Sequence, residues 1–313
     1  IKKLIANSDI LFENFAPGVM ERLGLGWDIL KEVNPKLVMV SASGTGQSGP
    51  TRHYAAYGTL LQIYTGFAGL NGYPDRPASI GMAWADPLCG MLLAYVGVAA
   101  LRSSRNTGTG RHIDFSMVEA VLATMPGPLL EYQLTGSPAE PAGNDDHVFS
   151  PHGVYRAHGD DSWIAIAITD QAEWEALVEA IEVPAGAATW NLEKRRRRSE
   201  EIDGLIGAWV SEQDPAEAAR MLQTAGVPAS ESRSSHELVN DAHLNERGFF
   251  TMLKDRKGVD RLMPALPWRW QGGLNPRYGQ PPALGGDTKF VLKSILGYSD
   301  SEIKTMEEAG ALD

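Results

Sequence analysis

Short apolar runs separated by polar breaks indicate alternating strands and helices in the first part of the chain. Residues 9–15 and 37–42 form two such runs, and their composition is typical of buried strands. Between them, residues 19–25 and 27–33 have the spacing of short helices, and an Asn-Pro pair follows the second. A strand, helices and a further strand in this order predict a parallel sheet in an α/β fold.

A longer apolar pattern begins directly after Asp86. Pro87 is compatible with the start of a helix, because a residue in the first turn has no use for its backbone N–H. We therefore predict that Asp86 is the N-cap of this helix, a role that stabilises a helix by ~0.5–2 kcal/mol and requires no catalytic function. Glycines on both sides would let backbone approach the carboxylate closely. The apolar positions with helical spacing are Leu88, Met91, Leu92, Tyr95, Val98 and Leu101.

The pattern changes after a strand predicted at residues 111–116 and a long helix predicted at 117–135. Residues 137–150 are rich in Pro, Gly, Asp and Ala, which is typical of a linker. A hairpin predicted at 154–168 and several amphipathic helices follow. We therefore predict a large domain at 1–136 and a smaller domain at 151–270.

Composition and charge narrow the possible partners. The chain is 43% hydrophobic, enough for a substantial core, and its net charge of −11 argues against nucleic acid or an anionic membrane as a partner. The basic run 194–198 is flanked by acidic residues and is interpreted as a solvated helix face. One cysteine, Cys89, excludes an intrachain disulfide, and no run approaches the ~18 apolar residues of a membrane span. These features predict a cytoplasmic protein.

The sequence gives little support for dinucleotide binding or for metal binding. The loop 44–49 formally matches a dinucleotide fingerprint, but no amphipathic helix follows it and no acid lies about 20 residues further on to bind a ribose. The loop is interpreted as backbone that lines a substrate site. His147 and His152 lack a carboxylate at ligand spacing, so we predict no metal site.

Four motifs in a fixed order resemble family III CoA-transferases, the group that includes formyl-CoA transferase, carnitine CoA-transferase and related acyl-CoA racemases. The resemblance implies a Rossmann-like large domain with a parallel sheet, a smaller α+β domain, and an interlocked homodimer. It also implies that residues 271–313 return to the large domain. The chain starts without Met, so we expect the family's first strands to precede residue 1. The motifs are Glu13-Asn14-Phe15-Ala16-Pro17-Gly18, Gly44-Thr45-Gly46-Gln47-Ser48-Gly49-Pro50, Asp86-Pro87-Leu88-Cys89-Gly90 and residues 105–114.

The same resemblance assigns roles to residues. Asp86 matches the nucleophile, Asn14 and Phe15 match positions that contact CoA, and Arg22 matches an arginine that contacts a phosphate, although a plain surface arginine remains an alternative. CoA thioesters are then substrates, with no permanently bound cofactor. The glycine-rich loop that covers the family's intermediate has no clear counterpart near 145–160. Further substrate-site candidates are Gly44, Tyr57, Gln62 and His152.

Tyr57 bears on the choice between transfer and racemisation. By resemblance, racemases carry a histidine at this position as a second acid/base. A phenol with an ordinary pKa of about 10 replaces it poorly. The sequence therefore favours a CoA-transferase, and an acyl-CoA racemase or an inactive fragment remain the alternatives.

Overall fold

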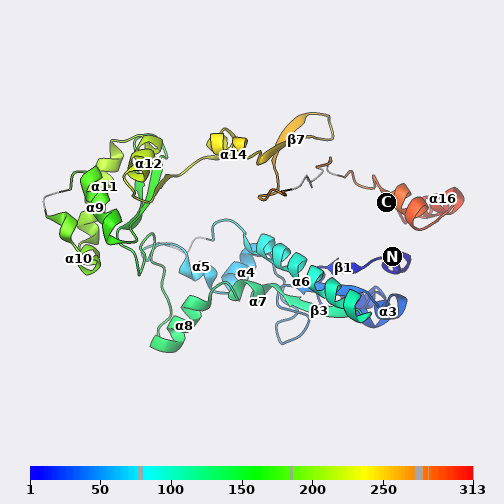
Figure 1. The fold of residues 1–313 in the computed structure, drawn as a ribbon. Coiled ribbons are helices and arrows are strands. Elements are labelled where there is room, and N and C mark those ends of the chain that lie inside the picture. The colour runs from blue at the N-terminus through cyan, green and yellow to red at the C-terminus, as the bar shows by residue number, and fades with distance from the viewer. Residues whose placement is uncertain (77–79, 184–185, 272–277, 281, 313) are drawn as a thin grey trace. The chain divides into compact units, whose positions relative to one another are not determined.

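The computed structural model describes residues 1–76, 80–183, 186–271, 278–280 and 282–312. The chain divides into two units (Figure 1). Unit 1 comprises Ile1–Gly143 and Phe290–Ile303, and unit 2 comprises Asn144–Lys289 and Lys304–Asp313. The two are described in turn.

Unit 1 is built on a parallel sheet of three strands, as the sequence predicts. The strands are β1 (Ile10–Glu13), β2 (Val38–Ser43) and β3 (Arg111–Ser116), in the order β1-β2-β3. Both pairings are parallel. Every residue of the central strand β2 is buried, which explains its continuous run of small and apolar side chains.

Two helices of unit 1 differ from those that the sequence predicts. The helical spacing of Tyr57, Leu60, Leu61 and Tyr64 predicts a helix at 54–64, but the helix begins only at Gly58, because Tyr57 has extended backbone. The helix expected at 117–135 is two helices, since Met125 precedes Pro126 and the residue before a proline disfavours helical backbone. The helices are α1 (Lys2–Ile5), α2 (Val19–Arg22), α3 (Trp27–Val33), α4 (Gly58–Tyr64), α5 (Phe67–Leu70), α6 (Ala85–Thr107), α7 (Met117–Leu122) and α8 (Pro126–Thr135).

Helix α6 lies along the sheet (Figure 1). Gly97 permits this close approach, because a Cβ atom there would lie 2.4 Å from Cζ of Phe12 in β1. Among the described residues, α6 is the one helix whose length and composition would suit a membrane span, a test that core helices of soluble proteins also pass. One side of α6 packs against β1 and β2, and 22% of its apolar stretch is buried in the structure.

Unit 2 contains an antiparallel sheet and a separate hairpin. The sheet has the order β4-β5-β6, with strands β4 (His152–Arg156), β5 (Trp163–Ala167) and β6 (Ala229–Glu231). The hairpin pairs β7 (Phe250–Lys254) with β8 (Asp260–Pro264). The helices are α9 (Gln171–Ala180), α10 (Leu192–Arg197), α11 (Ser199–Ser211), α12 (Pro215–Thr224), α13 (Ser235–Val239) and α14 (Ala242–Glu246).

The last elements lie near the C-terminus. A short helix α15 (Thr288–Phe290) continues into a π-helical turn, Val291–Ile295, and α16 (Asp300–Glu308) follows. Ile303 of α16 is buried.

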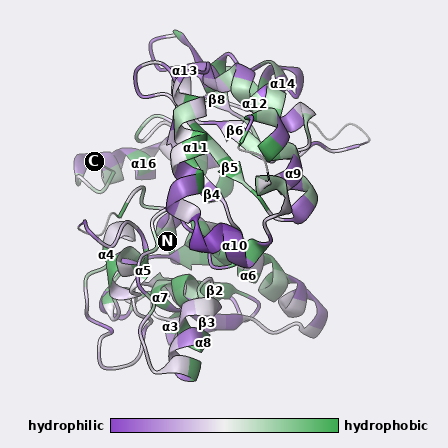
Figure 2. Cartoon of the chain, turned by 90° about the vertical axis from the view of Figure 1, so that its left-hand side faces the viewer, coloured by the Kyte–Doolittle hydropathy of each residue, from purple (hydrophilic) through white to green (hydrophobic). Residues whose placement is uncertain are grey.

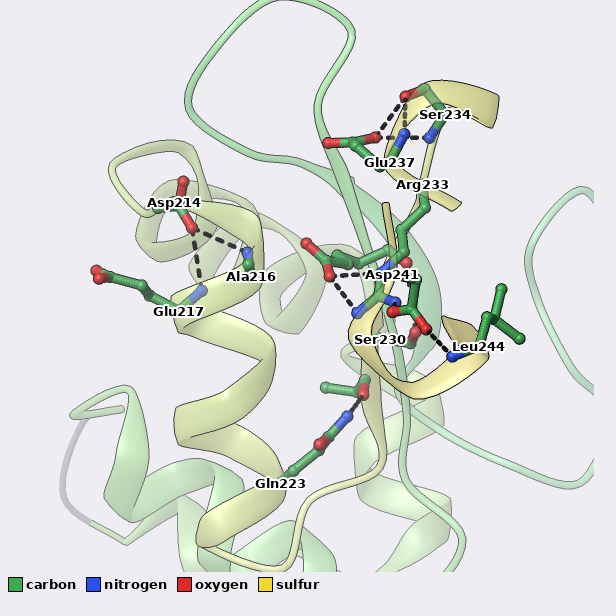
Figure 3. A network of polar contacts seen from close by, with 12 residues as sticks. Asp214, Ala216, Glu217, Gln223, Ser230, Arg233, Ser234, Glu237, Asp241 and Leu244 are labelled. Carbon is green, nitrogen blue, oxygen red and sulfur yellow. Dashed lines mark hydrogen bonds and ion pairs between the residues drawn. The ribbon is translucent and has the colours of Figure 1, made fainter. Parts of the chain in front are cut away.

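Side chains cap most helices of unit 2. Asp214 accepts hydrogen bonds from the backbone N–H groups of Ala216 and Glu217 at the start of α12 (Figure 3). Ser234 and Glu237 form a reciprocal capping box at α13. These caps satisfy N–H groups that a helix leaves without partners. Beside them, Arg233 forms ion pairs with Glu231, at 2.6 Å, and with Asp241.

The basic run 194–198 lies mostly in α10, which is strongly hydrophilic in Figure 2. The interpretation of this run as a solvated face is wrong for one member. Arg195 is buried, and its guanidinium donates to the carbonyl of Ser150 at 2.8 Å and to Oε1 of Gln171 at 2.8 Å. It therefore ties α10 to the segment that leads into β4.

Candidate active site

The carboxyl ends of the three parallel strands meet around Asn14. Asn14 directly follows β1, and its Nδ2 donates to the carbonyl of Ala42 in β2 at 2.7 Å. The same Nδ2 lies 3.9 Å from Sδ of Met117, which directly follows β3. Glu13 fixes the turn after β1, because its carboxylate accepts a hydrogen bond from the N–H of Phe15 at 2.8 Å. The side chain of Asn14 thus lies at the edge where an α/β sheet binds ligands.

Asp86 lies in the first turn of α6 and is exposed. The prediction that it is the N-cap is wrong: Trp84 is the N-cap, Ala85 is already helical, and the N–H of Leu88 donates to the carbonyl of Trp84 at 3.1 Å. Pro87 fits this frame equally well, because the first-turn N–H groups have no partner within the helix. The Asp86 carboxylate is therefore free of a capping role.

Cys89 connects Asp86 to the strand ends. It follows Asp86 by three residues and so lies on the same side of α6. Its thiol lies 3.8 Å from the carbonyl oxygen of Met117 and donates to it. Burial, with a smaller contribution from the negative charge of Asp86, raises the pKa of the Cys89 thiol to about 11. Cys89 and Asn14 thus both contact Met117, and Asp86 lies three residues before Cys89 in α6.

Two close approaches bring the glycine-rich loop and α4 to the same place. A Cβ atom on Gly44 would lie 2.2 Å from Cβ of Ala56, so the loop packs directly on the segment before α4. A Cβ atom on Gly58 would lie 2.7 Å from Oδ2 of Asp86. Tyr57 lies between these two contacts, caps α4 with its backbone and is 71% exposed. Gly44, Tyr57 and Asp86 are therefore brought together.

The loop 44–49 is held by its own contacts. The N–H of Gln47 donates to Oδ1 of Asp114 at 2.8 Å, and Oγ1 of Thr45 donates to the carbonyl of Thr51 at 2.8 Å. Turns follow the loop, and the next helix begins only at Gly58. The loop therefore lacks the helix N-terminus on which a dinucleotide pyrophosphate would sit.

Gln62 is fully buried in α4. Its Nε2 donates to the carbonyls of Ile80, at 3.2 Å, and Met82, at 3.4 Å, in the segment that leads into α6. Its Oε1 is one of three buried polar side-chain atoms without a hydrogen-bond partner among the described residues; the other two are Oγ of Ser43 and Nε2 of Gln47. Sequence reasoning missed Ser43 and Gln47, although both adjoin or lie in the loop it singled out.

Phe15 and Arg22 lie at the turn between β1 and α2. Phe15 is about half exposed. The guanidinium of Arg22 lies over Gly18, where a Cβ atom would be 3.3 Å from it, and Gly18 has the left-handed backbone that favours glycine, with φ +82°. Arg22 is exposed and able to reach a phosphate in solvent.

His152 belongs to unit 2 and is described within it. Its Nδ1 lies 2.6 Å from the carbonyl oxygen of Asn144. It lines a cavity of about 160 Å³ together with Asp145, Arg196 and Asp203. Burial raises the pKa of Asp203, whose carboxylate accepts a hydrogen bond from the hydroxyl of Tyr155 at 2.7 Å. Within the described ranges, no three His, Cys, Asp or Glu side chains are grouped to hold a metal ion.

The site of unit 1 has the parts that acyl chemistry requires. The exposed carboxylate of Asp86 lies in the first turn of α6 and against Gly58 of α4. It precedes by three residues Cys89, whose thiol contacts Met117 after β3. A carboxylate can attack an activated acyl group, and first-turn N–H groups can stabilise the oxyanion that forms. Unit 1 thus combines a parallel α/β sheet with an exposed carboxylate in the first turn of α6.

Comparison with known proteins identifies the family. The model of CoA-transferase family III matches residues 1–288. The succinyl-CoA–D-citramalate CoA-transferase of Chloroflexus aurantiacus is 30% identical over 98% of this chain and 77% of its own length. The alpha subunit of a succinyl-CoA–L-malate CoA-transferase of Chloroflexus aurantiacus is 32% identical over 97% of this chain and 72% of its own length.

A solved structure shares the fold. The crystal structure of a CAIB/BAIF family protein from Brucella suis superposes with a TM-score of 0.81 at 24% identity, covering 94% of this chain and 77% of that chain. The chain belongs to CoA-transferase family III. It is thus an enzyme of the CoA-transferase class.

Proposed function

We propose that the protein moves CoA from an acyl-CoA donor to a carboxylic acid acceptor, with Asp86 as the nucleophile. The observation that carries this proposal is the Asp86 carboxylate itself, exposed in the first turn of α6 and placed against Gly58 and near Cys89. The relatives named above, which act on succinyl-CoA with citramalate or malate, support thioesters and carboxylic acids as the two substrate classes.

The reaction proceeds through two kinds of covalent intermediate on Asp86. A carboxylate oxygen of Asp86 attacks the thioester carbonyl. The C–S bond breaks, CoA departs as its thiolate, and Asp86 is joined to the donor acyl group in a mixed anhydride. The thiolate attacks Cγ of Asp86, which releases the donor acid as its carboxylate and forms an aspartyl-CoA thioester. The acceptor carboxylate then repeats these steps in reverse order, and Asp86 returns to its free form. Each step exchanges one acyl bond for another and needs no added proton.

The local environment suits a charged nucleophile. The positive end of the α6 dipole favours an ionised carboxylate in the first turn. The N–H groups of the first turns of α4 and α6 have no helical partners, and neither helix has a side-chain cap. They can therefore donate to the tetrahedral oxyanions of the anhydride and thioester steps.

Other candidate residues are assigned to binding. We assign Asn14, Phe15 and Arg22 to CoA, and Gly44, Tyr57, Gln62 and His152 to the substrate site. Gln62 acts through the segment before α6, because its Nε2 is already engaged by backbone carbonyls. The phenol of Tyr57 favours transfer over racemisation. No cofactor is expected to remain bound between turnovers.

The proposal includes an interlocked homodimer in the cytoplasm, with a large domain, a linker, a small domain and a return segment. Exposed apolar side chains on one side of α6, namely Met91, Tyr95 and Val98, support a subunit interface there. Interlocked chains cannot separate while folded. Sedimentation over a wide concentration range should show no folded monomer, and a reversible monomer–dimer equilibrium would contradict interlocking.

The nucleophile is tested by substitution and trapping. Asp86→Ala should abolish transfer, with the fold retained by circular dichroism, because an exposed carboxylate without a capping bond contributes little to stability. Wild-type protein incubated with acyl-CoA and then hydroxylamine should carry a hydroxamate on Asp86 alone. Transfer that survives in Asp86→Ala would exclude the assignment. Deuterium entering the α-carbon of the acyl group without any acceptor acid would indicate a racemase instead.

A further inference from the structure

Gly58 is a glycine that the backbone does not need. It is the first residue of α4, it is buried, and its φ lies outside the left-handed region in which glycine is favoured. Alanine is the best helix former and glycine among the worst, so helix propensity argues against glycine at this position. Another constraint must account for the missing side chain.

The constraint is the space occupied by Asp86. A Cβ atom on Gly58 would lie 2.7 Å from Oδ2 and 3.2 Å from Cγ of Asp86, and 3.1 Å from Cβ of Ala83. The closest of these atoms is the end of a side chain that can rotate. A methyl group at position 58 would therefore turn the carboxylate away, and Ala83 would have to shift by only a few tenths of an ångström.

Gln62 supports the same place from one turn further along α4. Residues four apart lie on one face of a helix, and helical side chains lean toward the N-terminus, so the side chain of Gln62 lies beneath Gly58. Its Nε2 holds the carbonyls of Ile80 and Met82, which precede Asp86. α4 thus fixes both the carboxylate and the segment that leads to it.

We propose that Gly58 and Gln62 are positioning residues that hold the Asp86 carboxylate in the orientation required for attack. The proposal rests on Asp86 being the nucleophile. Attack requires the reacting atoms to be aligned at contact distance, and a displacement of about 1 Å costs about 100-fold in rate. The effect should fall on the chemical step and leave the binding of CoA unchanged, since neither residue is assigned a contact with CoA.

The test compares Gly58→Ala with Gly127→Ala. Gly127 is also a glycine in the first turn of a helix, α8, and a Cβ atom there would have no neighbour within 4 Å. For Gly58→Ala we expect kcat and the rate of hydroxamate formation on Asp86 to fall about 100-fold. Its KM for the acyl-CoA should stay within about twofold of wild type, and its melting temperature should stay close to that of wild type. Gly127→Ala should keep the wild-type kcat.

A Gly58→Ala variant with wild-type kcat would overturn the proposal, and so would a rise in KM at unchanged kcat, which would make Gly58 a substrate contact. If the variant melted at a lower temperature, Gln62→Met would decide, because methionine keeps the length and apolar packing and removes the hydrogen bonds. A fall in its kcat at unchanged KM supports the proposal, and full activity overturns it. Activity in Asp86→Ala would instead contradict the nucleophile, so the two failures are distinguishable.

Discussion

Units 1 and 2 differ in how their apolar side chains are buried and in how the first turns of their helices are capped. The buried apolar side chains of unit 2 form one cluster, whereas those of unit 1 form three separate clusters. In unit 2, side chains cap α9, α10, α12, α13 and α14. In unit 1, Ser116 caps α7 and Ser299 caps the start of α16. The other α-helices described in Ile1–Gly143 have no side-chain cap, and α2, α3 and α5 begin on glycine.

The difference in capping affects which backbone N–H groups are available to a ligand. A cap satisfies first-turn N–H groups and so removes them from any ligand. The buried polar side-chain atoms that lack partners among the described residues, in Ser43, Gln47 and Gln62, all belong to unit 1. Buried groups of this kind are costly and persist mainly where function requires them. Unit 1 therefore contains the described buried polar atoms without partners, whereas the helix starts of unit 2 are mostly capped.

The largest effect is expected in the core of unit 2. Leu177 is fully buried against the single cluster. Leu177→Ala should lower the free energy of unfolding by ~2–5 kcal/mol, because the continuous packing leaves a cavity that cannot collapse. Urea unfolding followed by tryptophan fluorescence measures it. Leu177→Met is the matched control, with a loss below ~1.5 kcal/mol. Equal losses in the two variants would show that this core is loosely packed.

The close contact between Gly44 and Ala56 in unit 1 can be used to test whether the candidate site is rigid, although the buried apolar side chains of this unit form three separate clusters. Gly44→Ala forces two methyl groups into the 2.2 Å between position 44 and Ala56. We expect a loss of ~1–3 kcal/mol in unfolding free energy. Gly69→Ala, where a Cβ atom has no neighbour within 4 Å, should cost nothing. If Gly44→Ala were also neutral, the loop and α4 would move independently.

Substitution of Arg22 tests whether this exposed arginine of unit 1 binds a phosphate of the CoA substrate. Arg22→Ala should raise KM for CoA thioesters about tenfold through loss of one charge-assisted phosphate contact, with a smaller change in kcat. Arg102, which is exposed on α6, provides the control, and Arg102→Ala should keep the wild-type KM. Steady-state kinetics decides, and an unchanged KM in Arg22→Ala would leave Arg22 as a surface residue.

The smallest effect is expected from adding to α4 of unit 1 a side-chain cap of the kind found in unit 2. Tyr57 has the extended backbone of an N-cap and is mostly exposed, so Tyr57→Ser should stabilise α4 by ~0.5–1 kcal/mol. It should also lower kcat, because the new hydroxyl occupies first-turn N–H groups. Tyr57→Ala removes the phenol without adding a cap. Melting curves and kcat for the two variants separate these effects, and higher kcat in Tyr57→Ser than in Tyr57→Ala would show that free N–H groups are not used.

The sequence was most informative where one local signal dominates. Periodicity predicted the parallel strands and α3 closely, and four motifs led to the correct family. It was wrong about the capping role of Asp86, since proline is allowed anywhere in a first turn and does not reveal which turn residue caps. It also missed Gly58, because a helical glycine with ordinary backbone is distinguished only by its neighbour in space. Arg195 was misjudged for the same reason: its partners lie 5, 24 and 45 residues away.

The single cysteine gives the protein a practical property for spectroscopy. Cys89 is buried, and because burial raises its pKa to about 11, the thiol is protonated and poorly reactive at neutral pH. Maleimide or spin-label reagents should therefore leave the native protein unmodified. A cysteine introduced on the surface of each unit would then be labelled selectively, with no need to replace Cys89 beside the proposed nucleophile. Labels placed in this way would follow each unit separately.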